Sequence, residues 1–218
     1  MSSSGSANTV IGYKALNAPS KAQSNIVIGN MAMADATVDP LTGQGPVGNT
    51  VIGDFTMRRS GGSNSVTIGG NALALNQQGT GNVAVGVEAM VGLTSGNRNT
   101  AVGFGAMQSA SGTGNVAMGD GAGGFYNGNY SVFIGYRAGQ SATGDNQLHI
   151  ANNGSDSLIS GDFLTHEVTI NNIVNLEPRS IVPPSPKTGT IYMDDGTNTG
   201  GTPTLRVYIN ATIGWKDL

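Results

Sequence analysis

The chain has 218 residues, of which 11% are charged and 6% aromatic, while glycine fills 35 positions. This composition departs from that of an average globular enzyme, and low charge with 38% hydrophobic residues argues against disorder. The formal net charge is −3 and the ten Lys and Arg residues are scattered, so we expect no nucleic-acid binding. Cysteine is absent, which excludes disulfides, Cys-zinc sites and thiol catalysis.

The N-terminus carries neither a basic nor an apolar segment. It reads Met1-Ser-Ser-Ser-Gly-Ser6, and no run of 18 apolar residues occurs in the sequence. An export signal needs a basic segment followed by an apolar one, and a membrane helix needs a long apolar run. We therefore expect no signal peptide and no membrane insertion.

One short phrase repeats along the first two thirds of the chain. It opens with Asn or Ser in most copies, continues with three β-prone residues and ends with glycine, and the glycine is followed three residues later by Ala or Thr. The glycines step by 17, 24, 16, 17, 17, 16 and 16 residues, with Ala151 in the ninth slot: Gly12, Gly29, Gly53, Gly69, Gly86, Gly103, Gly119 and Gly135. A period near 16 leaves room for two short strands and two turns, so it predicts an all-β solenoid of about nine coils.

The conserved residue types of the phrase have structural interpretations. Each glycine is predicted at a tight turn where a Cβ would clash or φ must be positive. The opening Asn is predicted to bond the adjoining backbone, so that stacked copies form a ladder. The methionines that follow the repeat alanine are interpreted as core filler.

The longest step, between Gly29 and Gly53, carries an insertion. Residues 34–46 are rich in turn formers, so we expect them to loop out from one coil. This loop is the first candidate for a recognition loop.

Side chains alternate between the two faces of each strand. We expect one set to fill the roll: Ile11, Ile28, Ile52, Ile68, Val85, Val102, Met118 and Ile134, with the residues two positions earlier. The intervening residues should then point outward as an apolar stripe on a rod about 40 Å long. We predict that this stripe contacts copies of the same chain: Val10, Val27, Val51, Ala84, Ala101, Ala117 and Phe133. The alternative is that a thin, twisted roll keeps both sets partly internal.

The phrase from Asn99 to Met107 and its relatives resemble the head repeats of trimeric autotransporter adhesins, over roughly residues 8–151. The resemblance implies a left-handed parallel β-roll that assembles as a homotrimer. Such adhesins also carry an export signal, a coiled-coil stalk and a membrane-barrel anchor, none of which we expect here. Similar rolls occur in phage fibres and spikes.

The last thirty residues have a different pattern. Ile191 to Met193 and Leu205 to Ile209 are predicted to be two strands around a Gly- and Asn-rich turn, with Trp215 packing over the pair. A lone hairpin is marginal in water, so this module should need partner chains. The segment from Gly189 to Leu218 resembles the short hairpin-and-Trp ending of phage fibres and other virion proteins.

These patterns divide the chain into five segments. They are an N-terminal arm (1–7), the β-roll (8–151), a β-rich transition segment (152–176), a Pro-rich linker (177–188) and the C-terminal β-hairpin module (189–218). The linker has four prolines in nine residues and is expected to be extended and semi-rigid.

No residue pattern points to catalysis, a metal or a cofactor. His149 and His166 lack neighbours that would form a triad or metal site and are interpreted as structural. Asp194-Asp195-Gly196 could ligate a cation but has the composition of an ordinary turn, and Gly119 to Gly124 follows the repeat rather than a phosphate loop. Paired carboxylates of a glycosidase are missing, so we expect no enzymatic activity.

Four aromatic residues are candidate receptor contacts. Phe125, Tyr126 and Tyr130 are expected in one turn between coils, and Trp215 lies in the C-terminal module. Such side chains suit stacking on sugar rings, and equally suit packing against a neighbouring chain.

The expected function is that of a bacteriophage structural protein, a trimeric tail fibre or spike that binds the host surface through many weak sites. The alternatives are a capsid decoration (cement or head-fibre) protein and a bacterial surface adhesin. Expected partners are the chain itself, other virion proteins through the N-terminal arm or C-terminal module, and host surface glycans or proteins. The expected location is the virion surface, after synthesis in the host cytoplasm.

Overall fold

The computed structural model describes residues 5–17, 21–38, 43–171, 191–194, 204–210 and 214–217. The chain divides into two compact units, Met1–Asn171 and Asn172–Leu218. The described residues form strands and turns with no helix.

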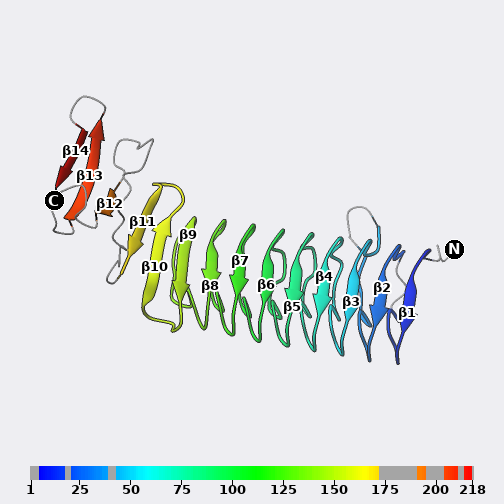
Figure 1. Cartoon of the computed structure of the whole chain (residues 1–218). Coiled ribbons are helices and arrows are strands. Elements are labelled where there is room, and N and C mark those ends of the chain that lie inside the picture. Colours follow the sequence, from blue (N-terminus) through cyan, green and yellow to red (C-terminus); the bar gives the residue numbers. More distant parts are fainter. Residues whose placement is uncertain are drawn as a thin grey trace. The chain divides into compact units, whose positions relative to one another are not determined.

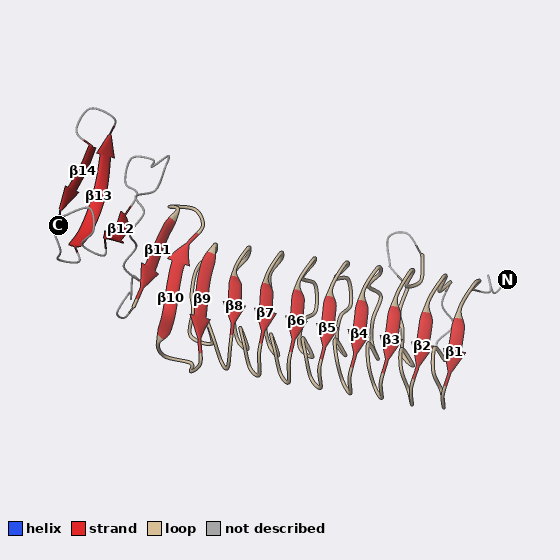
Figure 2. Ribbon diagram, in the orientation of Figure 1, coloured by secondary structure: helices blue, strands red, loops and turns tan. Residues whose placement is uncertain are grey.

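The first unit is built on one eleven-stranded sheet whose strands follow the order of the chain (Figures 1 and 2). The first eight strands have three residues each and pair parallel, in register, one with the next. They are β1 (Thr9–Ile11), β2 (Ile26–Ile28), β3 (Thr50–Ile52), β4 (Val66–Ile68), β5 (Val83–Val85), β6 (Thr100–Val102), β7 (Val116–Met118) and β8 (Val132–Ile134). The all-β solenoid is thus confirmed, with about 8 turns. The coil that contains each strand takes that strand's number below.

The ninth repeat begins as a coil and ends as a hairpin. β9 (Gln147–Ala151) pairs parallel with β8 but antiparallel with β10 (Ser157–Asp162), which pairs antiparallel with β11 (Glu167–Ile170). The described part of the expected transition segment therefore extends the sheet of the roll.

The repeat glycines occupy the turns for both predicted reasons. All eight have φ between +113° and +142°, which side chains rarely adopt. A Cβ at Gly86 would also lie 2.3 Å from the carbonyl oxygen of Gly103 in the next coil. The prediction for these glycines is confirmed.

The turn after each glycine contains left-handed residues that the sequence did not reveal. Met31 and Met33 have φ of +53° and +49°. The N–H of Met31 donates to the carbonyl of Tyr13 in the preceding coil, and the N–H of Met33 to that of Thr56 in the following coil. Left-handed conformation costs a non-glycine residue roughly 1–2 kcal/mol, and the hydrogen bonds to both neighbouring coils offset that cost.

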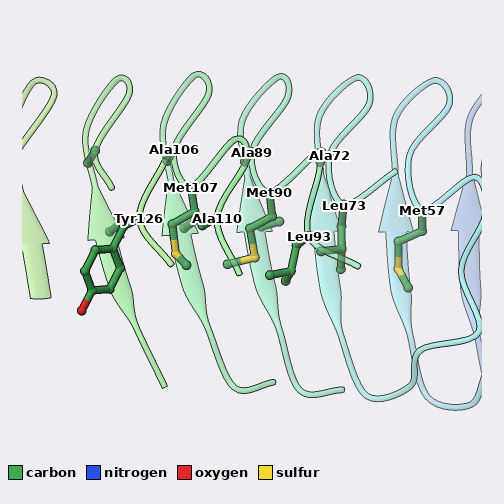
Figure 3. Close-up of a cluster of buried hydrophobic side chains, with 14 of the residues drawn as sticks. Met57, Ala72, Leu73, Ala89, Met90, Leu93, Ala106, Met107, Ala110 and Tyr126 are labelled. Carbon is green, nitrogen blue, oxygen red and sulfur yellow. The ribbon is translucent and has the colours of Figure 1, made fainter. Parts of the chain in front are cut away.

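The core is a narrow column of small and flexible side chains between the strands and the facing turns. The repeat alanines and the residues after them are buried, and Figure 3 shows them stacked coil by coil: Ala72, Leu73, Ala89, Met90, Ala106 and Met107. The core-filler interpretation is confirmed for Met33, Met57, Met90 and Met107.

The assignment of the two strand faces was wrong. The residues expected to face partner chains line the interior of a single chain and are fully buried: Val27, Val51, Ala84, Ala101, Ala117 and Phe133, together with Thr67. Val10 is 41% exposed because its coil is the first of the roll. The interior is too thin for two layers of large side chains, so mostly small residues point inward and the Ile-rich set faces outward.

The predicted asparagine ladder is confirmed. Asn49 Oδ1 accepts from the N–H of Ser65 at 2.9 Å, while its own N–H donates to Asn25 Oδ1 at 2.9 Å. Its side-chain Nδ2 donates to the carbonyl of Gly62 at 3.0 Å. The same bonding links Asn82, Asn99, Asn115 and Ser131. The buried amides thus satisfy one another and the backbone.

The second unit is a three-stranded antiparallel sheet. β12 (Ile191–Asp194) pairs with β13 (Thr204–Asn210), and β13 pairs with β14 (Gly214–Asp217). Two strands were expected; Trp215 lies in the third, in register with Tyr208. The described residues include neither the side chain of Trp215, nor the Pro-rich linker, nor Asp195-Gly196. The expectations for these three features stay predictions.

Candidate interaction surfaces

The outward positions of the first eight strands form a surface that we call the outer stripe. None of its side chains is charged, and most are aliphatic: Thr9, Ile11, Ile26, Ile28, Thr50, Ile52, Val66, Ile68, Val83, Val85, Thr100, Val102, Val116, Met118, Val132 and Ile134. The parallel register places equivalent residues beside one another, roughly 4.8 Å apart. Several are substantially exposed, including Ile68 (40%) and Met118 (46%). Soluble monomers rarely expose so continuous an apolar surface.

A second row lies directly after the turn glycines and was missed by the sequence reasoning. It exposes Tyr13, Val87, Phe104 and Tyr136. The Lys14 ammonium lies 5.3 Å from the Tyr13 ring centroid, and the Arg137 guanidinium 5.0 Å from that of Tyr136. The signal in the sequence was a large hydrophobic residue immediately after the repeat glycine, aromatic in three of these four coils.

Tyr126 is not a receptor contact. Its side chain is buried in the core, its ring meets Phe133 edge to face at 4.7 Å, and its hydroxyl bonds Ser131 Oγ at 2.7 Å and the Gly144 carbonyl. Burial raises the pKa of this hydroxyl. Coil 7 accommodates this large inward ring in part because Gly128 has no side chain, since a Cβ there would clash with the Tyr126 hydroxyl.

The other aromatic candidates have different outcomes. Phe125 and Tyr130 are exposed, so the structure leaves both available to a partner. Tyr130 lies over Gly114, where a Cβ would come within 2.8 Å of its ring. The side chain of Trp215 lies outside the described part of the chain.

His149 closes the core at the end of the coil stack. Its ring stacks on Phe133 at 5.8 Å, and its Nδ1 lies 2.7 Å from Ser157 Oγ. Nε2 is buried and has no hydrogen-bond partner among the described residues, and desolvation lowers the pKa of the ring. A cavity of about 120 Å³ beside it is lined mainly by small polar residues of the turn before β10. The arrangement agrees with a structural histidine.

A larger groove lies at the base of the insertion. It has a volume of about 590 Å³ and is lined by Asp35, Thr37, Val38, Arg59, Gln77 and Gln78. These residues come from three neighbouring coils, the second to the fourth. Asp35 Oδ2 lies 2.8 Å from Nε of Arg58. Of the insertion, residues 39–42 lie outside the description, so its full course remains a prediction.

The described ranges hold neither a candidate metal cluster nor a candidate membrane span. No group of three or more His, Asp or Glu residues there could hold a metal ion. No helix long and apolar enough to cross a bilayer occurs there either.

Comparison with known proteins returned no relative. No protein-family model, curated protein sequence or solved structure matches the chain.

Proposed function

We propose that the chain is a structural protein of a bacteriophage virion, a homotrimeric fibre or spike that projects from the particle and binds the host surface. The observation that carries the proposal is the outer stripe. It is uncharged along eight coils, and it faces outward from a roll whose own core is already filled.

Copies of the same chain are the most economical cover for this stripe. Every copy carries the same rows at the same spacing, so parallel copies about a common axis meet row against row. Burial of apolar surface contributes about 25 cal/mol per Å² removed from water. The outer stripe replaces the partner-facing set that the sequence predicted, while the trimer itself is supported by the resemblance to adhesin heads.

The roll suits a mechanical role. Each coil is tied to the next by parallel strand pairing, by backbone bonds in the turns and by the asparagine ladder. A rod of this kind holds equivalent surfaces at fixed spacing on each copy. Weak sites on three copies then bind with an effective affinity far above that of one site.

Decoration of the capsid is the second candidate. In the first coil the inward Val10 is exposed, whereas the equivalent Val27 and Val51 are fully buried. An open end of this kind suits contact with another virion protein. A bacterial surface adhesin is the third candidate.

The oligomer is tested by light scattering on the purified chain. We expect a trimer for the wild type and a monomer for the double variant Ile68→Lys, Val102→Lys, because each change places a charge in the stripe. Leu75→Lys is the matched control, since Leu75 is also 40% exposed but lies outside the stripe. A wild-type monomer at micromolar concentration would contradict the proposal.

The role in the virion is tested by a paired pull-down. The tag-free oligomer is incubated with host cells, and separately with virions stripped of this protein. Saturable binding to cells supports the host-binding fibre, whereas binding to capsids alone transfers the role to decoration.

A further inference from the structure

The groove of coils 2 to 4 is lined in part by residues at equivalent positions of neighbouring coils. Thr37, Gly61 and Gln77 each lie eight residues after the turn glycine of their coil. The N–H of Thr37 donates to the carbonyl of Ser60, and that of Gly61 to the carbonyl of Gln77, both at 3.1 Å. The middle coil has no side chain at Gly61, but its Arg59 lines the groove together with residues of coils 2 and 4.

The space directly over Gly61 is already filled by its neighbours. A Cβ at Gly61 would lie 2.6 Å from the carbonyl oxygen of Gln77 and 3.0 Å from Thr37 Oγ1. Contacts that short leave no room for a side chain without moving the neighbouring backbone. This position therefore requires glycine, and the groove beside it is lined by side chains of coils 2, 3 and 4.

Most side chains that line the groove are polar, and they are exposed. Thr37, Gln77 and Gln78 offer hydroxyl and amide groups that both donate and accept, and all three are exposed without a side-chain bond to any described residue. Arg59 is also exposed and forms no ion pair within the described part, because the neighbouring Asp35 is paired with Arg58. Val38 adds an apolar contact at the rim.

We propose that this groove binds a saccharide unit that carries a carboxylate. Vicinal hydroxyls of a sugar ring both donate and accept, as the two amides and the threonine hydroxyl do. The free guanidinium of Arg59 can bind a carboxylate through two parallel N–H···O bonds, and the aliphatic face of the ring can lie against Val38. The inference rests on the proposed host-binding function and names the chemical class of its surface ligand.

The size and composition of the groove agree with this ligand. Its volume of about 590 Å³ lies within the usual range of small-molecule sites. No aromatic side chain is among its described lining residues, so a ligand that depends on ring stacking, such as a nucleobase, is disfavoured.

The test is calorimetric titration of the intact oligomer with two short oligosaccharides, one ending in glucuronic acid and one in glucose. We expect saturable binding that is tighter for the acidic sugar. Arg59→Gln should abolish this preference, weakening the acidic ligand at least tenfold and leaving the neutral one unchanged. The double variant Gln77→Ala, Gln78→Ala should weaken both. Arg98→Gln, which changes an exposed arginine on another coil, should have no effect.

The outcomes separate the groove from the proposed function. The groove proposal is overturned if neither sugar binds, if the two bind equally, or if the groove variants bind like the wild type while melting normally. If the wild type and the groove variants bind host cells equally, the proposed function stands and the groove is rejected as the host-binding site. Absence of cell binding by the wild type rejects the proposed function, while the titration still reports on the groove.

Discussion

The ring of Phe133 occupies the space that a side chain at Gly139 would fill. A Cβ at Gly139 would lie 1.9 Å from Cδ1 of Phe133, and one at Gly123 would lie 3.0 Å from Cδ2. In the earlier coils the inward strand residue is Val, Thr or Ala, and the position of these glycines holds Leu or Met. The core therefore exchanges one large residue on the strand for two glycines on the facing turns, and keeps its packing.

Because Phe133 fills the space beside Gly139, substitutions at these two positions should be strongly coupled in the free energy of unfolding. Phe133→Ala should destabilise the roll by about 3–5 kcal/mol through the cavity it leaves. Gly139→Leu alone should be destabilising by overpacking, although its φ of +67° lies in the left-handed region that Leu16 (+46°) and Leu73 (+51°) also occupy. The double variant should recover part of the loss, as measured by urea unfolding. Strictly additive changes would show that the two sites do not share one space.

The same Val→Ala substitution should destabilise the roll by different amounts in different coils. Val10 and Val51 have the same neighbours, Asn-Thr before and Ile-Gly after, but only Val51 is fully buried. We expect Val51→Ala to cost roughly 2 kcal/mol and Val10→Ala less than about 0.5 kcal/mol. Thermal melting of the two variants compares them directly, and equal losses would mean that the first coil is covered in solution.

Replacing a ladder asparagine should cost less stability when the new side chain keeps an oxygen. Asn49→Leu leaves the N–H of Ser65 and the carbonyl of Gly62 without the partners they have now, at about 1–3 kcal/mol for each unsatisfied buried group. Asn49→Ser should cost less, since Ser65 already bonds the N–H of Asn82 through its hydroxyl at 3.2 Å. Chemical denaturation gives the two values; a serine as damaging as leucine would contradict this account.

Stability should fall in mild acid because of His149. Burial lowers its pKa in the folded state, so the folded protein binds fewer protons than the unfolded chain, whose histidine titrates near about 6.5. The contribution is present above that pH and is lost as pH falls below it. His149→Phe should therefore flatten the dependence of unfolding free energy on pH between 7 and 5.

A matched control isolates this effect. His166 lies outside the buried end of the core and is exposed, so His166→Gln is the histidine replacement against which His149→Phe is compared. An unchanged slope in His149→Phe would assign the acid sensitivity to other groups.

Much of the roll could be predicted from local sequence. The period of the glycines set the length of a coil, and the need for positive φ and close approach placed each glycine at a turn. The asparagines were assigned to a ladder because identical polar residues stack when coils stack. These features depend on spacing and backbone chemistry, which a sequence displays directly.

The direction of the side chains could not be predicted in the same way. Both faces of each strand are apolar, so alternation alone does not say which one is inside; the width of the roll decided it, and the larger Ile residues point outward. Tyr126 had the local composition of a surface turn, but the space beside Phe133 placed it in the core.

The sequence by itself determined a repeating parallel coil with glycine turns and a polar ladder. The tertiary structure decided which apolar face is exposed, how the last coil becomes the three antiparallel strands β9–β11 and where the groove lies. Thr37 and Gln77 are forty residues apart in the chain, yet both line one groove because the coils stack. Such surfaces arise from the contacts between neighbouring coils, which local periodicity does not contain.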